Sequence, residues 1–139
     1  MRTPTEDAEQ KALFEWAAYQ KCKYPELECM YHIPNEGKRS AQTGAKLKSM
    51  GLSPGVPDIC LPVARGGYSA LYIELKRTKG GRLSDNQCAW LGRLNKWGCL
   101  AVRCDGWEMA KRVIEGYLEG KMIAVGKTQV DASRNGSTV

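Results

Sequence analysis

Two apolar segments joined by a glycine-rich turn constrain the fold of this chain more than any other feature. The segments run from Val56 to Leu61 and from Ala70 to Lys76, and Arg65-Gly66-Gly67 between them supplies the backbone freedom of a tight turn. In a hairpin that is symmetric about Gly66, the numbers of paired residues sum to twice 66. The sequence therefore predicts that Asp58 lies directly opposite Glu74.

Side chains alternate between the two faces of a strand, so this hairpin separates its polar residues from its apolar ones. Asp58, Glu74 and Lys76 are expected on one face. The other face would enter the core and carries Ile59, Leu61, Leu71, Ile73 and Leu75. Two carboxylates whose Cβ atoms lie about 5 Å apart repel each other unless a cation lies between them.

Oxygen ligands favour Mg²⁺ or Mn²⁺ over zinc, and such ions commonly bind one or two carboxylates together with waters and a phosphate. The ammonium group of Lys76 could orient an attacking water and offset charge on phosphoryl oxygens. Asp58, Glu74 and Lys76 therefore predict metal-assisted hydrolysis of a phosphodiester. The alternative is a surface hairpin that carries a Glu-Lys pair and an unrelated aspartate.

Length and charge favour a small domain with a polyanionic partner. The chain has 139 residues, enough for one core, and we expect a single domain over residues 1–127 with a flexible tail at 128–139. Lys and Arg number 21 against 15 acids, a formal charge of +6, which favours polyanions. With no long apolar run and no signal-peptide pattern, we expect a cytoplasmic protein that does not contact membranes. The six cysteines are expected to be reduced and mostly buried.

Periodicity and capping residues predict the order αβαββαβα, an α/β fold. The first helix is expected to start at Thr3 as N-cap, with Pro4 at its first position and Glu6 in a capping box, and to stop before Tyr24-Pro25. The other predicted elements are a strand at 29–33, a helix at 41–50, the hairpin, a helix capped by Ser84 with Leu91, Leu94 and Trp97 buried, a strand at 100–104 and a helix at 107–118.

The run Pro54-Gly55-Val56-Pro57-Asp58, followed after fifteen residues by Glu74-Leu75-Lys76 and then by Gln87, resembles the PD-(D/E)-x-K nuclease signature. In particular it resembles the virus-type replication-repair nuclease (VRR-NUC) family, with further matches at Ile33-Pro34-Asn35 and Trp107. The resemblance implies a restriction-endonuclease-like mixed β-sheet flanked by helices. It also implies a Mg²⁺- or Mn²⁺-dependent endodeoxyribonuclease that cuts DNA, with branched substrates such as four-way junctions or flaps in some members.

Stand-alone, phage-type members of that family act as homodimers, so the resemblance also implies a dimer and, for a phage protein, the cytoplasm of a bacterial host. By resemblance Asp58, Glu74 and the Leu75 carbonyl would be metal ligands, and Lys76 the catalytic lysine. Gln87 would hold the lysine or a water, or cap its helix, and the two roles are compatible.

The family also places a glutamate near the metal on the first helix. Here Glu6 is the candidate, with Gln10 one turn later, and Glu9 is its competitor. A plain capping role for Glu6 is the third possibility.

Basic residues near the predicted site are expected to meet phosphates, and the strongest candidates are Arg39, Arg77, Lys79 and Arg82. Gly80-Gly81 would let the loop after the catalytic strand close on nucleic acid. The main rival is a non-catalytic DNA-binding or assembly module that retains the nuclease fold, and an RNA-directed nuclease is a further alternative. Gly37-Lys38-Arg39-Ser40 lacks the glycine spacing of a phosphate-binding P-loop.

Overall fold

A mixed four-stranded sheet forms the centre of the protein, which the computed structural model describes over residues 2–34 and 40–121. The strand order is β1-β2-β3-β4. The strands are β1 (Tyr31–His32), β2 (Ile59–Leu61), β3 (Leu71–Lys76) and β4 (Leu100–Asp105). β1 and β2 pair antiparallel, as do β2 and β3, whereas β3 and β4 are parallel. The prediction of a mixed sheet flanked by helices is therefore confirmed.

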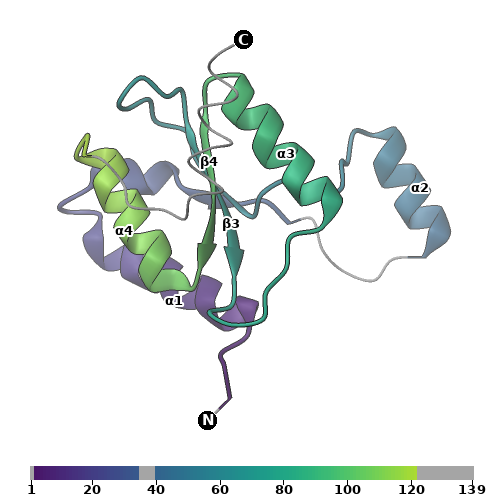
Figure 1. The fold of residues 1–139 in the computed structure, drawn as a ribbon, viewed down its shortest axis with the longest axis horizontal. Coiled ribbons are helices and arrows are strands. Elements are labelled where there is room, and N and C mark those ends of the chain that lie inside the picture. The colour runs from purple at the N-terminus through teal and green to yellow at the C-terminus, as the bar shows by residue number, and fades with distance from the viewer. Residues whose placement is uncertain (1, 35–39, 122–139) are drawn as a thin grey trace.

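Helices cover both faces of this sheet (Figure 1). They are α1 (Glu6–Gln20), α2 (Ala41–Ser49), α3 (Asp85–Lys96) and α4 (Trp107–Leu118), and a 3₁₀ helix, η1, spans Pro25–Cys29. α1 and α4 pack together over β3 on one face, and α3 packs against β4 on the other. The predicted order αβαββαβα holds with η1 added, while the predicted tail at 128–139 lies outside the described residues.

The core is built around β3, because the parallel β3–β4 pair carries helices on both faces. Leu71, Ile73 and Leu75 of β3 are each 1% exposed and belong to one apolar cluster with Leu13 of α1 and Ile114 of α4. Five of the six residues of β3 are buried, so β3 lies in the middle of the core.

The register of the β2–β3 hairpin agrees with the sequence prediction. Ile59 pairs with Ile73, and the Gly66-Gly67 turn is closed by reciprocal hydrogen bonds between the backbones of Arg65 and Tyr68. β2 is shorter than predicted, however, and begins at Ile59. Pro57 explains the late start, since proline offers no N–H to a strand ladder.

The predicted start of the first helix is wrong by two residues. Thr5, not Thr3, is the N-cap, and its hydroxyl oxygen accepts a hydrogen bond from the Ala8 N–H at 3.1 Å. Glu6 is then the first residue of α1, so it is not the distal member of a capping box. The first turn still carries three acids, which suit the positive end of the helix dipole.

The start of α3 is confirmed and its buried face is partly corrected. Ser84 and Gln87 form a complete capping box. Trp97, predicted to be buried, is 78% exposed, and the buried residue in the last turn is Asn95. The Asn95 side chain donates to the carbonyls of Leu91 and Ala101 and accepts from the Ala101 N–H, which fastens α3 to β4. The burial of Asn95 was not predicted, because asparagine is usually a surface residue and does not count toward an apolar periodicity.

The cysteines are all free, as predicted, but they are not mostly buried. Only Cys60 and Cys104 are buried, and Cys22, Cys29 and Cys88 are exposed. Burial raises the pKa of the Cys104 thiol to about 12. Cys104 is therefore an unreactive core residue at neutral pH.

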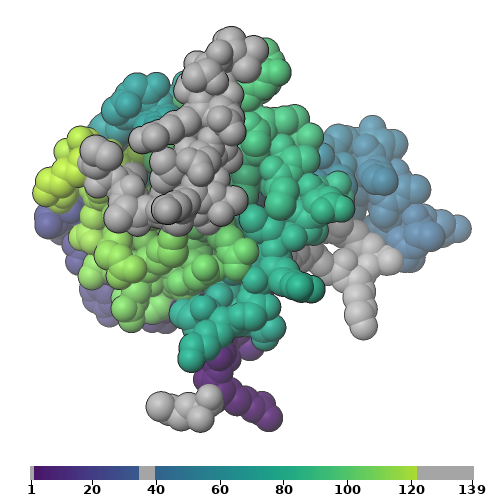
Figure 2. All heavy atoms as spheres, viewed as in Figure 1, coloured from purple at the N-terminus to yellow at the C-terminus, as the bar shows by residue number. Residues whose placement is uncertain are grey.

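α2 stands apart from the rest of the protein. It has no buried residue, and among the described residues it packs extensively against no other helix or strand. It projects beyond α3 from one end of the molecule (Figures 1 and 2). Its observed span fits the predicted helix, and Gly51 follows with a φ of 103°, the left-handed conformation expected there. In the described part of the chain, no helix has the length and apolar character to cross a membrane.

Candidate nuclease active site

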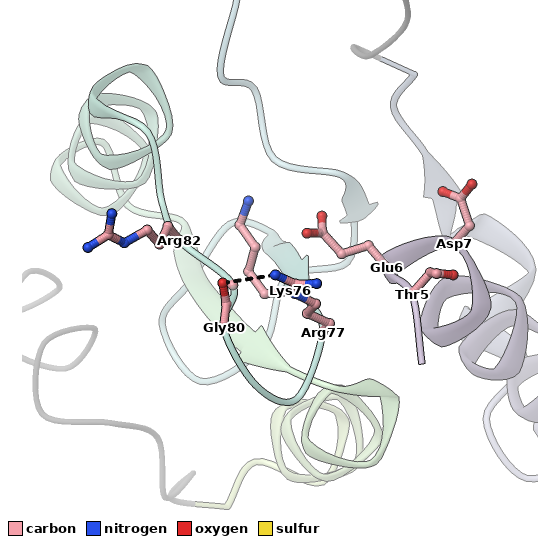
Figure 3. A pocket seen from close by; sticks show the side chains of 8 residues that line it. Thr5, Glu6, Asp7, Lys76, Arg77, Gly80 and Arg82 are labelled. Carbon is pink, nitrogen blue, oxygen red and sulfur yellow. Dashed lines mark hydrogen bonds between the residues drawn. The ribbon is translucent and has the colours of Figure 1, made fainter. Parts of the chain in front are cut away.

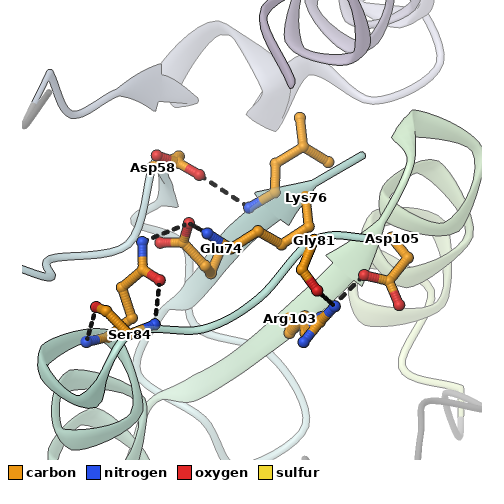
Figure 4. Close-up of polar contacts among 9 residues, drawn as sticks. Asp58, Glu74, Lys76, Gly81, Ser84, Arg103 and Asp105 are labelled. Atoms are coloured by element: carbon orange, nitrogen blue, oxygen red, sulfur yellow. Dashed lines mark hydrogen bonds and ion pairs between the residues drawn. The ribbon is translucent and has the colours of Figure 1, made fainter. Parts of the chain in front are cut away.

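Asp58 and Glu74 come from the two neighbouring segments of the hairpin, as predicted. Asp58 lies one residue before β2, and its Oδ2 accepts a hydrogen bond from the backbone N–H of Leu75 at 2.9 Å. Its backbone carbonyl accepts a hydrogen bond from the Ile33 N–H, so Asp58 is fixed between β1 and β3. Glu74 of β3 is fully buried at 0% exposure. Asp58 therefore faces the segment of β3 that contains Glu74 (Figure 4).

Lys76 and Gln87 converge on Glu74. The Lys76 ammonium nitrogen lies 3.6 Å from Glu74 Oε2, and Lys76 is itself 5% exposed. Gln87 Nε2 donates to the same Glu74 oxygen at 3.3 Å, while Gln87 Oε1 accepts from the Ser84 N–H at 2.9 Å. Gln87 therefore caps α3, and its side-chain amide contacts Glu74 of the candidate site. Its role in holding Lys76 or a water stays a prediction.

The donor set fits a divalent metal. Asp58, Glu74 and Lys76 are buried together and carry one net negative charge in their ionised forms, an arrangement that a further cation would stabilise. Among the described residues no group of three His, Cys, Asp or Glu side chains is arranged to hold a metal. Mg²⁺ does not require such a cage, since one or two carboxylates with waters and substrate oxygens suffice. The Leu75 carbonyl remains a predicted ligand.

Glu6 lies across a pocket from Lys76. The pocket has a volume of about 550 Å³ and is lined by residues of the N-terminus of α1 and of the loop after β3: Thr5, Glu6, Asp7, Lys76, Arg77, Gly80, Gly81 and Arg82. Figure 3 shows that Glu6 and Lys76 come from facing walls of this pocket. Since Glu6 does not belong to a capping box, its position is compatible with the predicted role near Lys76.

Glu9, the competing glutamate, lies in a different place. It is 4% exposed, and its Oε1 accepts a hydrogen bond from the backbone N–H of Trp107 at 3.3 Å. Gly106, the N-cap of α4, has no side chain that could cap the helix. Glu9 therefore supplies from α1 the cap that α4 lacks, which is a structural role.

The basic candidates separate into three groups. Arg77 and Arg82 line the pocket beside Lys76. Lys79 is exposed on the same loop. Arg39 lies outside the described residues. The loop after β3 thus places cations at the entrance to the site, where a polyanion would approach.

Arg103 and the packing role of Gly81 were not predicted from the sequence. Arg103 of β4 lies in register beside Glu74, and its Nη2 donates to the Gly81 carbonyl at 2.7 Å. A signal was present, because a charged residue interrupts the otherwise apolar run from Leu100 to Cys104. The charge could be related to the site only through the parallel pairing of β3 and β4, which places Arg103 beside Glu74 although the two strands are far apart in the sequence.

Tyr72 is a poor candidate for proton transfer, although it lies on the same face of β3 as Glu74. Burial, with a smaller contribution from the neighbouring Cys60, raises the pKa of Tyr72 to about 12. Its hydroxyl therefore stays protonated near neutral pH.

This combination of fold and site defines a restriction-endonuclease-like nuclease domain, with a mixed sheet that presents an acidic pair and a lysine at the end of a hairpin. The family model described as the VRR-NUC domain matches residues 5–108. A solved structure described as a VRR_NUC domain protein is 30% identical, with a TM-score of 0.76, and the alignment covers 87% of this chain and 93% of that one. No curated protein matches the chain. The chain belongs to the VRR-NUC family of nuclease domains.

Proposed function

We propose that this protein is a divalent-metal-dependent endonuclease that hydrolyses DNA phosphodiester bonds, acting on branched or structured DNA such as four-way junctions or flaps. The observation that carries the proposal is the buried group of Asp58, Glu74 and Lys76 at one end of the hairpin. Membership of a nuclease family supports the same chemistry.

Asp58, Glu74 and the Leu75 carbonyl would hold Mg²⁺ or Mn²⁺. The bound ion would supply Lewis-acid polarisation of the scissile phosphodiester. The Leu75 N–H orients the Asp58 carboxylate, and Gln87 restrains Glu74. Lys76 holds a positive charge beside Glu74, where it can orient water and offset charge that develops on phosphoryl oxygens. Glu6 faces Lys76 across the pocket and would act on the same water or ion.

DNA would approach along the loop after β3. Arg77 and Arg82 line the pocket and Lys79 is exposed nearby, so phosphates on either side of the scissile bond would meet positive charge. Arg39, just before α2, would extend this contact. A formal charge of +6 for the whole chain supports a polyanionic substrate.

We further propose a single nuclease domain over residues 1–127 that works as a homodimer in the cytoplasm, in a bacterial host for a phage protein. Two active sites related by symmetry would allow both strands of a branched substrate to be cut. Gel filtration with light scattering tests the dimer. A monomeric mass at the concentrations that support cleavage would contradict it.

The decisive experiment compares the unmodified protein with Asp58→Asn and Lys76→Ala on linear, flapped and four-way DNA, with Mg²⁺, with Mn²⁺ and with EDTA. We expect metal-dependent cleavage that either substitution lowers by at least about 100-fold. Asp58→Asn would weaken a proposed metal ligand, and Lys76→Ala would remove the positive charge proposed to face the reacting phosphate. Lys11→Ala, an exposed position on α1, serves as the matched control and should cut normally.

The alternative is a non-catalytic DNA-binding or assembly module. It gains support if the unmodified protein binds DNA but no metal promotes cleavage. Equal cleavage by Asp58→Asn, Lys76→Ala and the unmodified protein would show instead that the active site lies elsewhere.

A further inference from the structure

The aliphatic part of the Lys76 side chain packs closely against the backbone at Gly81, in the loop after β3. A Cβ atom added at Gly81 would lie 2.9 Å from Lys76 Cβ and 3.4 Å from both Cγ and Cδ. Real Cβ atoms essentially never come so close, so only glycine lets the loop lie against this side chain. Gly81 therefore packs directly against the aliphatic part of the Lys76 side chain.

Arg103 is hydrogen-bonded to the backbone of Gly81. Its Nη2 donates to the Gly81 carbonyl at 2.7 Å, and its Nε donates to Asp105 Oδ1 at 2.8 Å (Figure 4). In the parallel β3–β4 ladder Arg103 is the partner of Glu74 and Asp105 is the partner of Lys76. β4, the strand next to β3, thus holds the loop that lines the pocket beside Lys76.

An ordinary surface ion pair would be the simpler account of Arg103. The Arg103 and Asp105 side chains are 23% and 42% exposed, and exposed pairs of this kind contribute little to stability. That account leaves the bond from Arg103 to Gly81 unexplained, because Gly81 lies on a different element and contacts the Lys76 side chain. The contacts therefore connect Arg103 to Lys76 through the loop backbone.

We propose that Arg103 and Gly81 form a clamp that positions the Lys76 ammonium group against Glu74, so that Arg103 is a positioning residue for the reaction. The inference rests on the proposed function only in taking Lys76 as the catalytic lysine. Neither member of the clamp needs to touch DNA. Loss of the clamp displaces Lys76 while the sheet and the acidic pair remain.

Gly81→Ala tests the clamp most directly, with Gly92→Ala as its matched control. Gly92 lies in α3 with nothing within 4 Å of an added Cβ. We expect Gly81→Ala to lower kcat by about 10- to 100-fold with KM for DNA within about twofold, since a small misplacement of a catalytic group is costly. Gly92→Ala should leave both constants unchanged. A normal kcat in folded Gly81→Ala would overturn the proposal.

Arg103 variants give a second test that does not crowd the loop. Arg103→Gln should lower kcat, and Arg103→Lys, which keeps a donor on a long stem, should restore part of it. An increase confined to KM in both variants would identify Arg103 as a phosphate contact and contradict the clamp. Circular dichroism and thermal unfolding establish that each variant is folded.

A readout independent of cleavage separates this inference from the proposed function. In protein with ¹³C-labelled lysine side chains, the Lys76 signal, assigned by its loss in Lys76→Ala, should shift in Gly81→Ala and Arg103→Gln but not in Gly92→Ala. An unmoved signal overturns the clamp whatever the protein cleaves. A shifted signal in a protein that cuts no DNA supports the clamp while the proposed function fails.

Discussion

α2 and α3 begin with the same kind of N-cap but differ in how much they contact the rest of the protein. Ser40 caps α2 by accepting from the Thr43 N–H at 3.1 Å, and Ser84 caps α3 by accepting from the Gln87 N–H at 3.1 Å. Beyond the cap they diverge. Asn95 fastens α3 to β4 and Gln87 reaches Glu74, whereas α2 has no buried residue.

The difference shows that the same serine N-cap can have two structural consequences. In α2 the cap stabilises a helix that has little tertiary support, so its stability rests on local terms. In α3 the residue that completes the cap also restrains a candidate metal ligand. The first turn of a helix thus contributes to a candidate site only when tertiary packing places a residue of that site within reach of its side chains.

The largest effect on stability and activity is expected from a substitution in the loop from α2 to β2, where the loop packs against α3. Gly55, in the loop from α2 to β2, has a φ of 92°, and a Cβ there would lie 2.5 Å from the carbonyl carbon of Asn86 in the first turn of α3. We expect Gly55→Ala to lower the free energy of unfolding by roughly 2 kcal/mol or more and to reduce nuclease activity by displacing Gln87. Urea unfolding and the cleavage assay measure the two effects.

Gly51→Ala is the matched control for that substitution. Gly51 also has a positive φ, 103°, but nothing lies within 4 Å of an added Cβ. It should show the backbone strain without the collision, and activity should be kept. Equal loss of activity in both variants would mean that the contact between this loop and α3 does not support the site.

The second-largest effect is expected from a substitution of Gln87, which caps α3 and also contacts Glu74. Gln87→Glu keeps an acceptor for the capping box but replaces the Nε2 donor with a carboxylate next to Glu74. We expect cleavage to fall by about 10- to 100-fold, as for other residues that restrain a metal ligand. Thermal unfolding should also occur at a lower temperature, because two neighbouring carboxylates repel each other.

On α2 the corresponding substitution is Thr43→Glu, which creates a capping box with Ser40. It should support the helix and leave cleavage normal. Reduced cleavage by Thr43→Glu would show that α2 takes part in the reaction, and normal cleavage by Gln87→Glu would show that the amide group of Gln87 is dispensable.

The smallest effect compares glycines in the middle of each helix. Gly44 in α2 and Gly92 in α3 both have open space around an added Cβ. Alanine should favour each helix by roughly 0.5–1 kcal/mol. For Gly92→Ala the gain should appear in global unfolding, and for Gly44→Ala it should appear in amide hydrogen exchange of α2 alone. A global gain from Gly44→Ala would contradict the independence of α2.

Much of the fold could be predicted because its signals are local. The alternation along the hairpin placed Asp58 and Glu74 opposite each other, and the register of Ile59 with Ile73 agrees with that placement. The capping box at Ser84 and the glycine after α2 were also recognisable. The errors at Thr3 and Trp97 arose where neighbouring residues offered equally good caps or equally regular periodicity.

The sequence by itself determined the hairpin, the acidic pair and the lysine, because turn chemistry and side-chain alternation act between residues close in the chain. Tertiary structure alone decided that Glu9 caps α4, that Glu6 faces Lys76 and that Arg103 reaches Gly81. Each of these depends on which strands and helices become neighbours, and that is set by burial of the whole core. Local patterns contain no record of such distant contacts.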